Sequence, residues 1–184
     1  NVDAEVAASL PYTSGSLLAA ARWALAHRAN TCSPTSGFHH AGYDEPEGYC
    51  TFNGLMVTAA KLLDEGRAQR IAILDCDVHY GNGTDDIIAR LGLQGRIIHH
   101  SMGQHFETRE QAGPEGIHFE AWLANALTQC AAADLVLTIR PESWSRCAFI
   151  LRDTRSIWSL DTETFSRASV SPPPTCSRVR DMLS

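Results

Sequence analysis

Along the first 139 positions, segments with apolar residues at helical spacing alternate with short segments typical of strands. Apolar positions three or four residues apart predict helices over Ser16–His27, from Asn53 to Gly66, from Thr84 or Asp85 to Leu91, and over Glu120–Ala132. The apolar run Ile71–Leu74 predicts a short buried strand over Arg70–Asp75, and Arg96–Ser101 and Asp134–Ile139 are predicted as the next two strands. Alternating strands and helices favour an α/β fold in which helices cover both faces of a parallel sheet.

Polar and glycine-rich segments set the expected ends of these elements. Ser14 or Ser16 is placed to cap the first helix and Asn53 the second, because short polar side chains accept the unpaired N–H groups of a first turn. Residues 30–52 are rich in proline, glycine and serine and are expected to form a loop. Gly81-Asn82-Gly83 predicts a turn.

The composition changes near residue 140. Residues 1–139 hold 8 basic and 16 acidic residues, whereas residues 140–184 hold 7 and 5. The later segment is rich in serine and contains Pro172-Pro173-Pro174, and within it only Cys147–Leu151 has a short regular period. We therefore expect a domain over 1–139 and a poorly ordered tail over 140–184, with an ordinary surface extension as the alternative.

Charge and cysteine usage narrow the class of protein. A balance of 15 basic against 21 acidic residues argues against direct nucleic acid binding and against an anionic membrane as partner. The six cysteines contain no C-x-x-C pair, no apolar run has the length of a membrane span, and no basic start followed by an apolar stretch marks a signal peptide. We expect reduced thiols and a cytoplasmic protein, while the oligomeric state is not indicated.

Two carboxylates and an imidazole lie at the end of the strand predicted over Arg70–Asp75 and just beyond it. In extended backbone alternate side chains share a face, so Asp75, Asp77 and His79 are expected to point the same way. Such a group favours a bound cation, and Asp oxygen and His nitrogen suit Zn²⁺ or another divalent metal. A strand end capped by surface acids is the alternative interpretation.

Adjacent histidines, His39 and His40, lie in the predicted loop. Exposure to solvent is the alternative interpretation for such a pair. Beside a hydrolytic metal, a neutral imidazole accepts a proton from water and an imidazolium donates one to the leaving amine. Each ring needs an orienting partner for its other nitrogen, and Asp75 and Asn82 supply one acceptor each.

A second glycine-containing segment follows the histidines. Gly48 would let backbone approach a substrate, and Tyr49 would form the wall of a narrow apolar channel. The alternative is that Tyr49 and Phe52 are core aromatic residues ahead of a helix. Cys50 is not expected to act as a nucleophile, because activated water already fills that role.

Three segments in order, Pro34–Ala41, Gly48–Asn53 and Asp75–Thr84, resemble the zinc-dependent histone deacetylase family. That family includes bacterial acetoin-utilisation and acetylpolyamine amidohydrolase relatives. The resemblance covers residues 13–139. It implies the arginase/deacetylase-like α/β fold as an incomplete domain, and hydrolysis of N-acetylated lysine or a related amine to acetate and the free amine.

The resemblance also implies roles for individual residues. Asp77 and His79 match two of the family's three zinc ligands. His39 and His40 match its histidine pair, with His40 as general base and His39 as electrostatic partner. Asp75 matches the carboxylate that orients His39.

Further positions match the surroundings of that centre. Asn82 stands beside the second histidine, where some members have Asp and others Asn. Gly48 and Tyr49 match the channel for the acylated side chain. Asp75 and Ser101 match a site for a monovalent cation such as K⁺.

The resemblance stops where the composition changes. The family's third zinc ligand is an Asp in a Gly-Ala-Asp segment, and a glycine-rich loop carries a tyrosine that polarises the substrate carbonyl. This chain continues with Arg140-Pro141-Glu142 and contains neither segment; nothing in the pattern makes Glu142 a replacement. We expect a fragment of weak or no activity that lacks its true start, since it begins with Asn1, and whose last 45 residues come from a shifted reading frame.

Two other function classes stay open beside a deacetylase. One is a non-catalytic binding module that keeps the pocket without the chemistry. The other is a ureohydrolase of the same fold, whose metal motif runs Asp-x-His-x-Asp. The order Asp75-x-Asp77-x-His79 favours the deacetylase.

Overall fold

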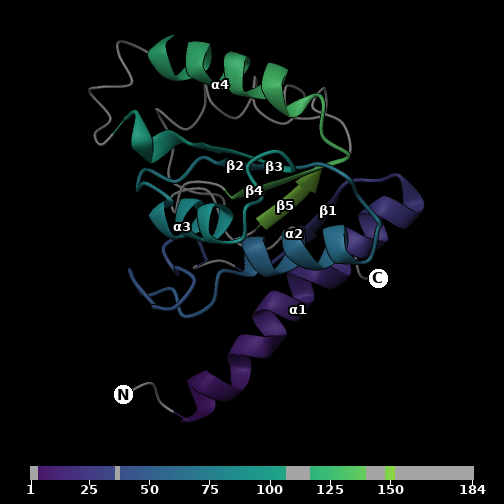
Figure 1. The fold of residues 1–184 in the computed structure, drawn as a ribbon, viewed down its shortest axis with the longest axis vertical. Helices are drawn as coiled ribbons and strands as arrows, with labels where there is room; N and C mark the ends of the chain where they lie inside the picture. The colour runs from purple at the N-terminus through teal and green to yellow at the C-terminus, as the bar shows by residue number, and fades with distance from the viewer. Residues whose placement is uncertain (1–3, 36–37, 107–116, 140–147, 152–184) are drawn as a thin grey trace, which may run out of the picture. The chain divides into compact units, whose positions relative to one another are not determined.

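The computed structural model describes residues 4–35, 38–106, 117–139 and 148–151, all of which belong to one unit of the chain. Its helices are α1 (Ala4–His27), α2 (Gly54–Asp64), α3 (Asn82–Arg90) and α4 (Ile117–Cys130), with a 3₁₀ turn η1 (Met102–Gln104). Its strands are β1 (Thr31–Ser33), β2 (Ile71–Asp75), β3 (Ile97–Ser101), β4 (Leu135–Ile139) and β5 (Ala148–Leu151). Figure 1 shows their arrangement.

The five strands form one sheet in the order β1-β5-β4-β2-β3. The expected parallel arrangement is confirmed for β4, β2 and β3, in which Asp75 lies opposite both Ser101 and Ile139. β5 runs antiparallel to β4 and to β1, so the sheet as a whole is mixed rather than parallel. The carboxyl ends of the parallel strands therefore meet at one edge, where Asp75 and Ser101 are found.

Helices cover both faces of this sheet, as the alternating pattern predicted. Figure 1 shows α4 over one face and α1, α2 and α3 over the other. Every residue of β2 and of β4 is buried, which fits apolar runs between two helical layers. The largest fully buried aliphatic side chains come from the sheet and from α1 and α2 on one of its faces: Leu17, Leu55, Leu62, Ile71, Ile73, Leu74, Leu135, Leu137 and Ile150.

The second helix begins and ends as its sequence predicts. The side chain of Asn53 accepts a hydrogen bond from the backbone N–H of Met56 and caps α2. Gly66 follows the helix with a φ of +66°, a conformation that glycine adopts without strain.

The first helix is longer than predicted. It begins at Ala4 and runs through Pro11 and Gly15, both poor helix formers that interrupt the apolar period. The predicted caps Ser14 and Ser16 are therefore wrong, because both lie inside α1. The hydroxyl of Ser16 instead lies 2.9 Å from that of Ser33 and links α1 to β1.

Two further expectations about local structure need correction. The segment predicted as a loop contains β1, a strand that has no apolar run and exists through its pairing with β5. The predicted Gly81-Asn82-Gly83 turn is replaced by the start of α3 at Asn82, so Thr84 and Asp85 do not begin the helix. The lack of a side chain at Gly83 lets α3 pack closely against the backbone of His40, since a Cβ at that position would lie 2.3 Å from the His40 carbonyl oxygen.

Residues beyond 139 include β5, which falls in the stretch where the sequence shows a short period. The rest of the predicted tail, 140–147 and 152–184, lies outside the described residues, and the division at residue 139 stays a prediction. Within the described part of the chain, no helix is both long enough and apolar enough to cross a bilayer.

Candidate active site

The site is built around Asp75, the last residue of β2, whose side chain is fully buried. One carboxylate oxygen lies 2.7 Å from Nδ1 of His39 and accepts a 3.4 Å hydrogen bond from the hydroxyl of Ser101. The other accepts the backbone N–H of Asp77 at 3.0 Å. A buried charge is costly unless it is hydrogen-bonded, and these three partners supply the required bonds.

Asp77 and His79 lie side by side just beyond the strand. Oδ1 of Asp77 accepts the backbone N–H of His79 at 2.8 Å and lies 2.8 Å from Nδ1 of the same ring. The Asp77 side chain is largely buried, whereas the His79 side chain is largely exposed to solvent. A carboxylate oxygen and an imidazole nitrogen thus face each other, and both are suitable zinc donors.

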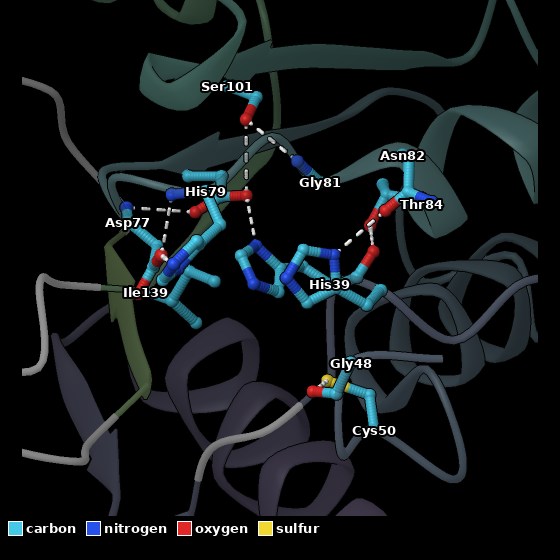
Figure 2. Close-up of polar contacts among 12 residues, drawn as sticks. His39, Gly48, Cys50, Asp77, His79, Gly81, Asn82, Thr84, Ser101 and Ile139 are labelled. Carbon is cyan, nitrogen blue, oxygen red and sulfur yellow. Dashed lines mark hydrogen bonds and ion pairs between the residues drawn. The ribbon is translucent and has the colours of Figure 1, made fainter. Parts of the chain in front are cut away.

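The histidine pair lies next to these donors. The ring centres of His39 and His40 are 4.1 Å apart, and those of His40 and His79 are 5.9 Å apart. Figure 2 shows His39 between Asp77 and His79 on one side and Asn82 on the other. The alternative interpretation of the pair as solvent-facing is wrong for His39, which is buried.

Each ring of the pair has its own acceptor at Nδ1. His39 Nδ1 faces Asp75, and His40 Nδ1 lies 2.8 Å from Oδ1 of Asn82, as the sequence analysis expected. Burial favours the neutral form of His39, but its hydrogen bond to Asp75 and the charges of Asp75 and Asp77 outweigh burial, so its pKa is raised above 6.5. His39 is therefore suited to carry positive charge beside the site.

Packing against α2 and α3 holds the histidine loop in place. The amide of Asn53 donates to the carbonyl of Ala41 at 3.1 Å and to the hydroxyl of Thr84 at 3.0 Å. The backbone N–H of Thr84 donates to the carbonyl of His39 at 3.1 Å. These contacts follow from no local motif, and no sequence pattern marks Thr84, because its role depends on a residue 45 positions away.

The next segment forms a tight turn over His40. Two backbone hydrogen bonds join Glu47 and Cys50, while Gly48 and Tyr49 have φ of +55° and +61°. Tyr49 is fully exposed and Phe52 is half-exposed, so their alternative interpretation as core aromatics is wrong. The predicted channel role of Gly48 and Tyr49 stays a prediction.

Cys50 lies beneath this turn and is buried. Burial raises the pKa of its thiol, although backbone N–H groups of His40 and Ala41 oppose that effect. A thiol of raised pKa is a poor nucleophile at neutral pH, in agreement with the expectation that Cys50 is not one.

A second hydrogen-bonded group adjoins the site through β3. Nδ1 of the buried His99 lies 2.7 Å from one oxygen of Asp85, and the hydroxyl of Tyr80 donates to the other at 2.5 Å. This hydrogen bond and the nearby charge raise the pKa of Tyr80 to about 12. The group fixes the backbone between β2 and α3, in which His79 lies.

The donor set fits zinc in part. Among the described residues, no group of three or more His, Cys, Asp or Glu side chains is arranged to hold a metal. Asp77 and His79 supply two donors, whereas a catalytic zinc site needs three protein ligands. Glu142 lies outside the described residues, and the predicted K⁺ site at Asp75 and Ser101 stays a prediction.

Comparisons with known proteins point to one family. The sequence model of the histone deacetylase domain matches residues 2–110. An acetylpolyamine amidohydrolase of Mycoplana ramosa is 43% identical over 101 residues, which cover 49% of this chain and 29% of the relative. Acetylpolyamine amidohydrolase 2 of Pseudomonas aeruginosa is 52% identical over 56 residues, 30% of this chain and 15% of the relative.

A eukaryotic relative matches the same family. Histone deacetylase 6 of Caenorhabditis elegans is 45% identical over 67 residues, which cover 36% of this chain and 7% of the relative. The chain thus spans less than a third of the length of each of these curated relatives.

Proposed function

Because the chain belongs to the histone deacetylase domain family, we propose that it is part of a metal-dependent hydrolase that removes acetyl groups from N-acetylated amines. The observation that carries this proposal is the pair His39 and His40, each bonded at Nδ1, beside the facing donors Asp77 and His79. Hydrolysis of an amide needs an activated water, a base and an acid, and this group of residues supplies positions for all three.

Asp77 and His79 would hold the metal, with a third ligand from outside the described residues. Zinc bound there would supply a Lewis acid and lower the pKa of a coordinated water. Nε2 of His40 accepts the proton of the attacking water, because Nδ1 of that ring is occupied by Asn82. His39, whose hydrogen bond to Asp75 favours the protonated ring, stabilises negative charge on the reacting amide.

The charge around His40 supports a cationic substrate. The hollow beside this ring is lined by four carboxylates and one guanidinium: Asp44, Glu45, Glu47, Asp86 and Arg90. A negative rim raises the local concentration of cations. An acetylated polyamine or an acetyl-lysine in a basic peptide fits that rim, and two of the relatives above are named for acetylpolyamines.

Acetate release by the zinc-loaded full chain tests this proposal. We expect an acetylpolyamine or an acetyl-lysine peptide to be hydrolysed, and His40→Ala to lower the rate by about 10²–10⁴-fold, the usual contribution of a positioned base. His27→Ala is the matched control, because His27 is exposed on α1 and stacks on Trp23.

A non-catalytic binding module is the second candidate, favoured by the finding that the described residues hold only two facing donors. It predicts binding of the acetylated amine with zinc well below one per chain and no acetate release. Zinc near one per chain with acetate release that His40→Ala abolishes would exclude it.

A further inference from the structure

We propose that Glu47 is a positioning residue for His40, acting through Asn82 to decide which ring nitrogen carries the proton. The catalytic meaning of this role rests on the function proposed above. The hydrogen bonds themselves belong to the folded chain without metal or substrate.

Two consecutive hydrogen bonds connect Glu47 to His40 through Asn82. Nδ2 of Asn82 donates to Oε2 of Glu47 at 2.6 Å, and Oδ1 of Asn82 lies 2.8 Å from Nδ1 of His40. An ionised carboxylate can only accept hydrogen bonds, so Glu47 must face the NH₂ end of the amide. The carbonyl end of Asn82 then faces His40.

The orientation of the amide selects the tautomer of the ring. An amide carbonyl oxygen also only accepts, so Nδ1 of His40 must carry the hydrogen and Nε2 keeps its lone pair. Without Glu47, the amide of Asn82 could rotate by half a turn and present its NH₂ group to His40. That orientation selects the opposite tautomer, in which Nε2 is protonated and cannot act as a base.

The other histidine of the pair needs no such help. His39 faces the carboxylate of Asp75, which accepts with either oxygen and cannot present a donor while ionised. An asparagine at position 82 is ambiguous in a way that a carboxylate is not. Glu47 removes that ambiguity.

The backbone places Glu47 for this role. Cys50 N–H donates to the carbonyl of Glu47 at 2.8 Å, and Glu47 N–H donates back at 3.2 Å. The positive φ values of Gly48 and Tyr49 between them are those of a type I′ turn, which fixes the residues at its ends closely. This turn therefore contacts the His40 ring directly through Gly48. It also contacts the ring indirectly, through the hydrogen bonds that join Glu47, Asn82 and His40.

The test is the tautomer of His40 in the metal-free full chain, read from the ¹⁵N chemical shifts of its two ring nitrogens. At about pH 8.5 an ordinary histidine is neutral, so the protonated and unprotonated nitrogens are distinguished directly. We expect Glu47→Ala to raise the Nε2–H form relative to the Nδ1–H form by about three- to tenfold, the range of one net hydrogen bond. Glu47→Gln is expected to shift the ratio in the same direction, because its NH₂ group can donate to the carbonyl of a rotated Asn82 as readily as its amide oxygen accepts from the Asn82 NH₂ group.

Two controls separate positioning from charge and folding. Glu120→Ala removes an exposed carboxylate of α4 and is expected to change nothing at His40. In an Asn82→Asp background, Glu47→Ala is expected to leave the tautomer unchanged, because a carboxylate at position 82 accepts from Nδ1 unaided. An unchanged tautomer in Glu47→Ala overturns the proposal, and so does an equal shift caused by Glu47→Ala in the Asn82→Asp background.

Kinetics on the zinc-loaded chain give a second readout. Positioning predicts that Glu47→Ala and Glu47→Gln lower kcat at constant KM, by no more than the factor by which the tautomer ratio shifts. A role of the charge in binding a cationic substrate predicts instead a raised KM in both variants, and that result contradicts positioning. If the chain releases no acetate, the function proposed above fails while the tautomer result still decides the role of Glu47.

Discussion

The contact between Gly48 and the ring of His40 leads to a sharp prediction for Gly48→Ala. A Cβ at position 48 would lie 2.4 Å from Cδ2 of His40 and 2.7 Å from its Cγ. Gly48 also has a φ of +55°, which costs an alanine free energy even in open space. The substitution therefore combines backbone strain with a collision against a proposed catalytic ring.

Gly66→Ala separates these two contributions. Gly66 has a φ of +66°, and a Cβ there would meet nothing within 4 Å. We expect Gly66→Ala to lower the free energy of unfolding by about 1–2 kcal/mol from backbone strain alone. Gly48→Ala has this cost plus about 1–3 kcal/mol, the usual range for overpacking, so its total is about 2–5 kcal/mol.

The same geometry sets the expected displacement of His40. Ordinary contact begins near 3.4 Å, so relief of the 2.4 Å approach requires the ring to retreat by 3.4 − 2.4 = 1.0 Å. A misplacement of that size costs about 10²-fold in rate when it affects a reacting group. Gly48→Ala is thus expected to lower kcat far more than Gly66→Ala does.

Urea unfolding of the two variants measures the stability loss, and the ¹⁵N and ¹H signals of the His40 ring report its position. We expect a larger loss for Gly48→Ala and a shift of His40 signals in that variant alone. Equal losses in both variants, with His40 signals at their parent positions, would refute the reasoning.

Three other outcomes follow from the site. Asn53→Ala removes a helix cap and two buried hydrogen bonds, so we expect it to lower the free energy of unfolding by about 2–4 kcal/mol. Urea titrations measure this loss, and a loss under about 0.5 kcal/mol would contradict the expectation. The raised pKa of His39 implies stabilisation that is full below pH 6.5, the ordinary value, and declines as pH rises through the folded-state pKa. The stability difference between the parent chain and Asp75→Asn should therefore shrink as the pH rises above 6.5, and a constant difference refutes it. Asp85→Asn is expected to lower the pKa of Tyr80 from about 12 towards 10, measured by ultraviolet absorbance, with an unchanged pKa as the contrary result.

Local patterns predicted the central part of the fold and the chemistry at its edge. β2 and β4 are apolar runs whose burial dictates their structure, and Asn53 is a cap that acts within its own helix. The meeting of Asp75 with His39 follows from topology, because a strand end and a neighbouring loop share one edge of the sheet.

Features that depend on distant partners were not predictable in this way. Thr31–Ser33 has no strand pattern of its own and becomes β1 by pairing with β5. Glu47 resembles any exposed loop acid in the sequence, and its link to Asn82 depends on how two separate segments fold together. Gly83 suggests a turn, whereas its lack of a side chain serves the close approach of the His40 backbone.

The position of β5 has a consequence for the order in which the chain assembles. Among the described strands, the earliest, β1, pairs only with β5, the latest. During synthesis, β1 must wait with its backbone groups unpaired until more than a hundred further residues have emerged. A chain released after Ile139 would therefore leave one edge of β4 unpaired and able to pair with a strand of another chain, including a second copy.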